Sequence, residues 1–380
     1  MLVYIEDIIT RFGGRYFGSE QERGAQLHTA EILRKYCDKV DVEEFLSPLE
    51  AHFHSLKGFC ITYVIVLGLM FISPLAAAIV GAINSVLFLG HFVTYRHWLD
   101  FLYKKKPSWN VIGDIEPTGE AKTTIIVAGH IDSVKEFKYW YRFKQNGAVM
   151  TIVASFSIVL LGVYAVLNAA ISAPWIGYGW WLFAALTPLL IVLFDMHGEE
   201  VVHGASDNLT GVAVSVEMAK VFSQERLKNT RLRVISFGSE EACLRGAWAY
   251  AKAHKEQLLK EKAFLFNLDT IKDTEHLTIG TSEVNTLVFY KKEHIDLVEQ
   301  AFIAENVPVK KLPLMVGASD GSAFHIQGLP AICVIAMDSG SLDPSYHTRL
   351  DTIDCINPEA LEAMKRVSMR FIKDWDARNA

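Results

Sequence analysis

Two long stretches of this chain contain no acidic or basic side chain, and they restrict its fold more than any other feature. They cover residues 58–95 and 147–194. A helix needs about 20 apolar residues to cross a bilayer, so each stretch has room for two helices. Turns are expected at residues 73–74 and 172–177. The alternative is a buried core hairpin or an apolar dimer interface, but stretches of this length favour two transmembrane helical hairpins.

Basic residues border both stretches on the side of the remaining chain, whereas the far-side turns carry no charge. They are Lys57, Arg96, Lys104, Lys105 and Lys106 around the first stretch, and Arg142 and Lys144 before the second. Loops rich in Lys and Arg stay on the cytoplasmic side of a membrane. The sequence therefore predicts a multi-pass integral membrane protein, with the lipid bilayer as a partner and the rest of the chain in the cytoplasm.

The bulk composition excludes some classes of protein. A net charge of -6 gives no reason to expect a nucleic-acid partner. The five cysteines are scattered and none forms a Cys-x-x-Cys pair, which argues against a disulfide framework and against a thiolate zinc site. Free thiols are typical of a reducing compartment. The acidic N-terminus has no basic region, so we expect no cleavable signal peptide.

Outside the apolar stretches, strand and helix patterns alternate, which predicts an α/β fold. Strands are expected at 123–128, 232–237, 263–268 and 331–336, and helices at 208–225, 244–259, 292–305 and 358–375. Ser19 and Glu22 form a capping box for an earlier helix. The predicted division is 1–56, 104–146 and 196–380 for one α/β domain, interrupted by hairpins at 57–103 and 147–195.

Ligand-type side chains follow three predicted strands directly. His130 and Asp132 follow the first, Glu240 and Glu241 the second, and Asp269 the third. Sites in open α/β sheets collect at the carboxyl ends of strands, so these groups are expected to converge. Asp207 at a helix start and His347 in a late loop complete the set.

Each of these residues alone has an ordinary explanation. An aspartate at a helix start is usually a cap, a histidine after a strand is usually structural, and a glutamate pair is usually solvated. Together they form the nitrogen and oxygen ligand set that zinc accepts. The segment from His197 to His203 resembles a zinc-binding H-E-x-x-H helix, but Glu199 stands where a histidine is required. We interpret Glu199, Glu200 and His203 as a juxtamembrane cap, with a minor gating role for His203 as the alternative.

The ordered motifs resemble those of the M28 metallopeptidases, the co-catalytic zinc aminopeptidases and their relatives. The motifs are His130-x-Asp132, Ala205-Ser206-Asp207-Asn208, Gly238-Ser239-Glu240-Glu241, Asn267-Leu268-Asp269 and Tyr346-His347-Thr348. The segment from Gly14 to Glu20 also resembles the opening helix of that family. The resemblance covers most of the chain outside the apolar stretches and implies a mixed central β-sheet flanked by helices.

The same resemblance implies roles for the residues that match. His130 and Asp269 would bind one Zn²⁺, Glu241 and His347 a second, and Asp207 would bridge both ions. Glu240 would be the general base, and Asp132 would orient His130. Spacing alone does not distinguish Glu240 from Glu241. The implied activity is removal of N-terminal residues from peptide substrates by a water bridged between two metals.

The sequence also offers candidate residues for the substrate side. Asp320, Phe324 and Tyr346 are candidates, and Phe324 either lines a pocket or simply packs. The loop from Ser319 to Phe324 matches the family, except that Gly321 stands where histidine is frequent. A carboxypeptidase, a glutaminyl cyclase and a non-catalytic membrane scaffold are the alternatives, and a homo-oligomer is possible.

Overall fold

The computed structural model of the protein describes residues 1–171, 176–338 and 343–379. The chain forms two compact units, and each is interrupted by the other in the sequence. The first comprises residues 1–49, 105–135 and 200–380, and the second 50–104 and 136–199. Both segments of the second unit begin before the predicted hairpins. One helix already starts at Ala51 and another at Lys138, and both starts precede the charge-free stretches.

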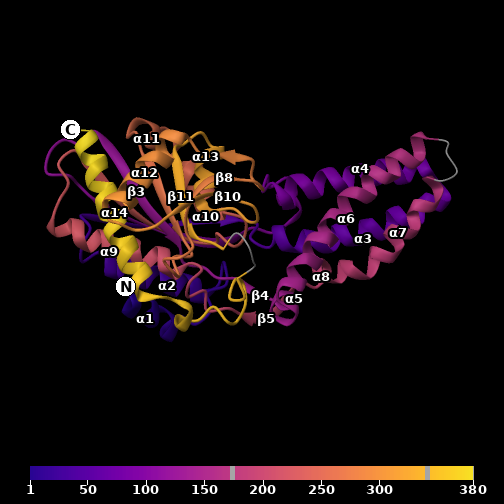
Figure 1. Ribbon diagram of the computed structural model, residues 1–380, viewed down its shortest axis with the longest axis horizontal. Helices are drawn as coiled ribbons and strands as arrows, with labels where there is room; N and C mark the ends of the chain where they lie inside the picture. Colours follow the sequence, from indigo (N-terminus) through magenta and orange to yellow (C-terminus); the bar gives the residue numbers. More distant parts are fainter. Residues whose placement is uncertain (172–175, 339–342, 380) are drawn as a thin grey trace. The chain divides into compact units, whose positions relative to one another are not determined.

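A mixed β-sheet forms the centre of the first unit (Figure 1). Its described strands are β1 (Lys39–Ser47), β2 (Lys106–Ile115), β3 (Thr123–His130), β6 (Thr230–Phe237), β7 (Phe264–Asp269), β8 (Leu277–Glu283), β9 (Val288–Phe289), β10 (Lys310–Leu314) and β11 (Ala331–Ala336). The order across the sheet is β1-β2-β6-β3-β7-β11-β8-β10, and β9 pairs with β8. All four strands predicted from the sequence are present.

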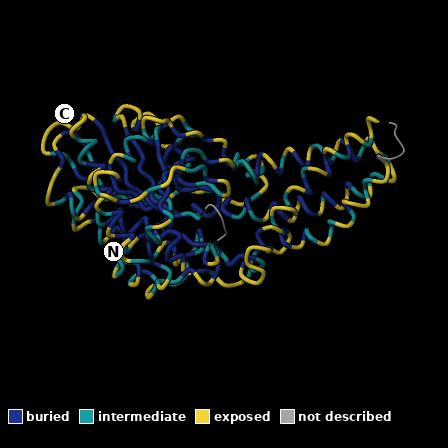
Figure 2. Tube along the Cα trace, viewed as in Figure 1, coloured by how far each residue is buried: buried dark blue, intermediate teal, exposed yellow. Residues whose placement is uncertain are grey.

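The four central strands β6, β3, β7 and β11 run parallel to one another. Strands β1, β2 and β8 are antiparallel to neighbours, which makes the sheet mixed. The side chains of β3 and β7 are buried along the whole strand (Figure 2). Continuous apolar strands of this kind are typical of a sheet covered on both faces. The carboxyl ends of β6, β3 and β7 consequently lie at one edge of the sheet.

Helices pack on the sheet in two groups. One group contains α1 (Leu2–Phe12), α2 (Glu20–Leu33), α9 (Leu209–Gln224), α12 (Lys292–Ala304) and α14 (Pro358–Arg378). The other contains α10 (Arg245–Ala253), α11 (Lys255–Lys260) and α13 (Asp320–Ile326). The helix predicted over 244–259 is thus two helices that meet at His254. Residues 14–19, predicted to open a helix, precede α2 as a turn that ends at the N-cap Ser19.

The second unit is helical. Its main helices are α3 (Ala51–Ile72), α4 (Pro74–Leu87), α6 (Gln145–Ala170), α7 (Trp180–Leu186) and α8 (Ile191–Phe194), with a short helix α5 (Lys138–Phe143) before α6. The turn predicted at residues 73–74 is confirmed, because Ser73 ends α3 and caps α4. The turn predicted at 172–177 falls mainly on residues 172–175, which lie outside the described residues. Strands β4 (Lys135–Phe137) and β5 (His197–Val201) pair where the chain enters and leaves this segment.

Four apolar segments of this unit are long enough to cross a membrane. They are Ala51–Ile72, Pro74–Val93, Gln145–Ala170 and Gly177–Phe194. Large apolar side chains such as Phe71, Ile83 and Phe156 are exposed, whereas the polar Asn84 and Ser85 are buried. Apolar groups outside and small or polar groups between helices are the pattern expected in lipid.

Candidate metal centre

The parallel strands bring the predicted ligands to one edge of the sheet, where the chain leaves β3, β6 and β7. His130 is the last residue of β3, Asp269 is the last of β7, and Glu240 follows β6 by three residues. Asp207 precedes α9, and the helix is capped by the next residue, since the Asn208 side chain accepts a hydrogen bond from the Gly211 amide. The ordinary explanation of Asp207 as a helix cap therefore does not apply.

Two clusters of potential ligands share one carboxylate. His130, Asp207 and Asp269 form the first cluster, and Asp207, Glu241 and His347 form the second. Within each cluster, one ligand atom from every residue lies within 4.8 Å of the others, and all five residues are buried. His130 Nε2 is 3.2 Å from Asp207 Oδ1, and His347 Nε2 is 3.4 Å from Asp207 Oδ2. The two oxygens of Asp207 thus face different histidines.

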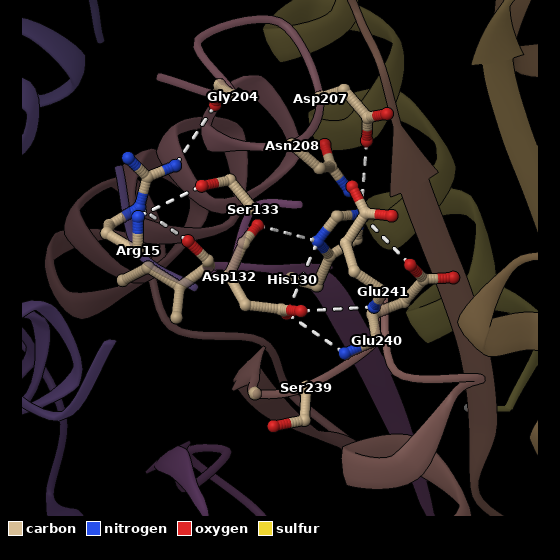
Figure 3. Close-up of polar contacts among 12 residues, drawn as sticks. Arg15, His130, Asp132, Ser133, Gly204, Asp207, Asn208, Ser239, Glu240 and Glu241 are labelled. Atoms are coloured by element: carbon tan, nitrogen blue, oxygen red, sulfur yellow. Dashed lines mark hydrogen bonds and ion pairs between the residues drawn. The ribbon is translucent and has the colours of Figure 1, made fainter. Parts of the chain in front are cut away.

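Two further aspartates hold the backbone of the ligand loops. Asp132 accepts hydrogen bonds from the amides of Glu240 and Glu241, at 2.9 and 3.0 Å, and lies 3.5 Å from His130 Nδ1 (Figure 3). Asp351 accepts from the amides of Ser206 and Asp207, at 2.7 and 3.1 Å. The family resemblance implied a role for Asp132 toward His130, and the structure adds a direct link to both glutamates.

The site concentrates negative charge in a buried place. Burial raises the pKa of Glu240 well above its usual value, and the carboxylates of Asp320, Glu241 and Asp269 add to this while His130 opposes it. Burial and the Asp207 charge raise the pKa of Asp269 to about 7. Burial lowers the pKa of His347, but Glu241 and Asp207 outweigh it and bring the pKa to about 10. Such a cluster of carboxylates favours a bound cation.

The residues fit divalent metal ions. The ligand atoms are imidazole nitrogens and carboxylate oxygens, which are common ligands of zinc in hydrolytic enzymes. Glu241 Oε1 is buried and has no hydrogen-bond partner among the described residues. A buried carboxylate oxygen without a partner is costly, and a metal ion would satisfy it. The second imidazole nitrogen of His130 faces Asp132, as is usual for a metal-bound histidine.

The three substrate-side candidates lie in different environments. Tyr346 stacks on His347 with ring centroids 3.9 Å apart. Asp320 is fully buried, and neither of its carboxylate oxygens has a partner among the described residues. Phe324 is 1% exposed and packs against Phe237 and Tyr250, which favours the packing role over the pocket. Gly321 has no room for a side chain, because its Cβ would lie 2.6 Å from the Tyr290 hydroxyl.

The sequence analysis did not find the contacts of Arg15, and it predicted the wrong partner for the Glu22 side chain. Ser19 caps α2 as predicted, but Glu22 does not complete a capping box; its carboxylate binds Gly18, Ser108 and Ser239 instead. Arg15 is fully buried beside the ligand loops. Arg15 lies in the segment from Gly14 to Glu20 that resembles the family, and Glu22 lies in the predicted capping box, but only the tertiary structure shows what the two side chains bind.

Most of the segment that resembles a zinc-binding helix is the strand β5 rather than a helix. Glu199 and Glu200 are exposed, and Glu200 pairs with Arg349 at 3.1 Å. Neither these glutamates nor His203 belongs to a ligand cluster in the part of the chain that the structure describes. The segment therefore lacks the helical geometry that a zinc-binding H-E-x-x-H motif requires.

Residues 190–372 match the sequence model of peptidase family M28. Among characterised proteins, the chain is similar to the aminopeptidase YwaD of Bacillus subtilis (strain 168), with 33% identity over 162 residues. That region is 42% of this chain and 35% of YwaD. Aminopeptidase NAALADL1 of Mus musculus is 25% identical over 249 residues, which is 58% of this chain and 32% of that protein. The matched region thus spans about a third of each of these relatives.

Solved structures show the same fold. A zinc aminopeptidase from Bacillus subtilis superposes with a TM-score of 0.60 at 17% identity, over 98% of this chain and 94% of that chain. The glutaminyl cyclase of Porphyromonas gingivalis gives 0.58 at 15% identity, over 98% and 96% of the two chains. The predicted fold, a mixed sheet flanked by helices, is confirmed. The chain is thus similar to M28 peptidases in sequence over residues 190–372, and it shares its fold with the solved structures.

Proposed function

We propose that this protein is a membrane-bound, zinc-dependent aminopeptidase. The observation that carries the proposal is Asp207, which is shared by two ligand clusters with different partners on its two oxygens. A shared carboxylate is the arrangement needed to hold two ions about 3.5–4 Å apart. We assign His130 and Asp269 to one Zn²⁺, Glu241 and His347 to the other, and Asp207 to both.

Bound zinc would polarise the peptide carbonyl and lower the pKa of a water molecule. Glu240 is the candidate general base, since its carboxyl lies 3.6 Å from His130 Nε2 and its raised pKa suits a group that takes up a proton. It would accept the proton of the attacking water and give it to the leaving amine. Asp132 keeps Glu240 and Glu241 in place through their amides.

Asp320 and Tyr346 are proposed to serve the substrate side. Burial raises the pKa of the unpartnered Asp320 carboxyl near His130 and Asp269, and a cationic substrate amine bound there would stabilise its ionised form. Tyr346 fixes the ring plane of His347 by stacking and carries a hydroxyl that can bind a peptide group. Both assignments apply to an enzyme that acts on free N-termini.

The four apolar segments are proposed to cross the bilayer as two hairpins. The basic residues that flank them support a cytoplasmic location for the first unit. Two hairpins are an even number of spans, so the chain returns to the same side after each. Residues before and after the hairpins can then contribute to one site, as His130 and Asp207 do.

The first test is hydrolysis of aminoacyl-naphthylamides by the protein purified in detergent, with and without a chelator. We expect release from substrates with a free amine and none from their N-acetylated forms. Glu240→Ala should lower kcat by at least about 100-fold, which is a typical contribution of a general base, while metal content stays unchanged. Glu199→Gln is the matched control and should behave as wild type, because Glu199 is exposed and outside both clusters.

The other outcomes point to specific alternatives. Cyclisation of N-terminal glutamine with no peptide hydrolysis would favour a glutaminyl cyclase, a class whose solved structures share this fold. Release of C-terminal residues would favour a carboxypeptidase. A protein with neither activity nor bound metal would be a membrane scaffold.

A further inference from the structure

Arg15 links the two loops that carry His130 and Asp207. It is fully buried, and its guanidinium donates to the carbonyl oxygens of Ile131 at 2.6 Å, His203 at 2.7 Å and Gly204 at 3.1 Å, as well as to Gly13 at 2.8 Å. Figure 3 shows the contact between Arg15 and Gly204. Ile131 directly follows His130, and Gly204 lies three residues before Asp207. One side chain therefore fixes the distance between two ligand loops that are far apart in the sequence.

The backbone around Arg15 strengthens this link. The Arg15 amide donates to Ser133 Oγ at 2.9 Å, and the Ser133 amide donates back to the Arg15 carbonyl at 3.0 Å. Ser133 Oγ in turn donates to the Val202 carbonyl at 2.8 Å. Side chain and main chain of residue 15 thus hold the same two loops.

Glu22 makes the corresponding contact to the third ligand loop. Its Oε1 accepts from the Ser239 amide at 2.7 Å, from Ser239 Oγ at 3.1 Å and from Ser108 Oγ at 3.0 Å. Its Oε2 accepts from the Gly18 amide at 2.7 Å. Ser239 is the residue before Glu240, so this fully buried carboxylate anchors the turn that presents the candidate base and the ligand Glu241.

We propose that residues 13–22 form a brace for the metal centre, in which Arg15 and Glu22 are positioning residues. The brace rests on the proposed function. Neither side chain is a ligand; each acts through the loops that present the ligands. Arg15 sets the geometry of the His130 and Asp207 pair, and Glu22 sets the direction of Glu240. Fixed support of this kind determines how well ligands and a base are held for their task.

Arginine is required by this geometry. A planar guanidinium presents five donors in a fixed fork and can bind several carbonyls at once, whereas a lysine ammonium is a compact point charge with a flexible stem. Arg15→Lys keeps the buried charge but cannot reach all of the loops. Arg15→Met removes the charge and every donor of the side chain.

The test for Arg15 measures zinc binding directly. Metal-free protein, prepared with a chelator, is titrated with Zn²⁺ against a chromophoric competitor, and metal per chain is counted after desalting. Arg15→Met should bind at least one ion about 10–100-fold more weakly than wild type, with Arg15→Lys between the two. If Arg15→Met does not fold, the zinc affinity of Arg15→Lys alone provides the test.

The matched control is Arg233→Met, which removes another buried guanidinium. Arg233 pairs with Asp114 at 2.6 Å and Glu261 at 3.1 Å, and neither partner belongs to a ligand cluster. It should keep the zinc affinity of wild type even if it unfolds at a lower temperature. Equal loss of zinc by Arg233→Met would show a general effect of stability and overturn the role of Arg15.

The test for Glu22 separates kcat from zinc affinity. Glu22→Gln places an amide donor opposite the Gly18 amide and weakens the anchor of Ser239. We expect kcat to fall about tenfold, with KM and zinc affinity within about threefold of wild type. A wild-type protein without zinc affinity would overturn the proposed function and the brace together. Normal zinc binding in both Arg15 variants, or normal kcat in Glu22→Gln, would overturn the brace alone.

Discussion

At the scale of single residues, the centre depends on buried carboxylates that bind backbone amides. Asp132 holds the amides of Glu240 and Glu241, Asp351 holds those of Ser206 and Asp207, and Glu22 holds that of Ser239. The loops that carry Asp207, Glu240 and Glu241 are thus held at their backbone amides, so these side chains need not anchor their own loops.

The buried Glu22 should make stability depend on pH. Burial raises its pKa to about 8, and the Asp132 charge adds to this. In the unfolded chain the pKa returns to about 4.3, so the folded state binds more protons between these values and loses stability as the pH rises from about 4 to 8. Glu22→Gln removes this contribution.

Thermal unfolding of the chelator-treated protein at pH 5 and pH 8 measures the effect. The drop in Tm between the two pH values should be smaller in Glu22→Gln than in wild type by roughly 2–4 °C or more. The exposed pair Lys292 and Asp296 provides a control, since Asp296→Asn should leave the pH dependence unchanged. An identical drop in wild type and Glu22→Gln would show that Glu22 is ionised throughout.

At the scale of elements, the parallel strands and the helix crossing of the second unit are the two decisive arrangements. The strands align the carboxyl ends of β3, β6 and β7, which assembles ligands from distant parts of the chain. In the second unit, α4 and α6 approach closely where Gly81 meets Gly162. Small residues at such a crossing allow backbones to pack directly.

The crossing predicts a large effect of one methyl group. A Cβ at Gly162 would lie 2.0 Å from Ser85 Oγ and 2.5 Å from the Gly81 carbonyl oxygen. Gly162→Ala should therefore destabilise the second unit by about 1–3 kcal/mol, as overpacking does. Gly68→Ala is the control in the same unit, because nothing lies within 4 Å of its Cβ. Thermal unfolding in detergent should separate the variants, and equal melting would show that the helices do not cross this tightly.

At the scale of the whole molecule, the proposed membrane topology is open to direct measurement. An epitope tag after Ala380 should be on the cytoplasmic face, so protease should remove it in inverted vesicles and spare it in sealed cells. The protein should also stay with the membrane after extraction at high pH and need detergent for release, since many large apolar side chains on its four long apolar segments are exposed. Release by alkali, or digestion of the tag in sealed cells, would contradict the topology.

The sequence by itself determined the local features of this protein. Charge-free stretches predicted the apolar helices, because apolar segments of this length are difficult to bury inside a water-soluble domain. The residues that follow strands predicted the ligands, because the carboxyl ends of parallel strands lie at one edge of the sheet. The family resemblance of the motifs implied two ligand sets that share Asp207, and the structure brings the same five residues together: His130, Asp207, Glu241, Asp269 and His347.

Only the tertiary structure decided the contacts between distant segments. Arg15 reaches loops 116 and 188 residues away, and Glu22 reaches a turn 217 residues away, so no local pattern could reveal their partners. The burial of Phe324 against Phe237 and the strand at His197–Val201 likewise depend on packing rather than on local preference. Local sequence sets which elements form, whereas the buried polar contacts that position the centre arise only when those elements pack together.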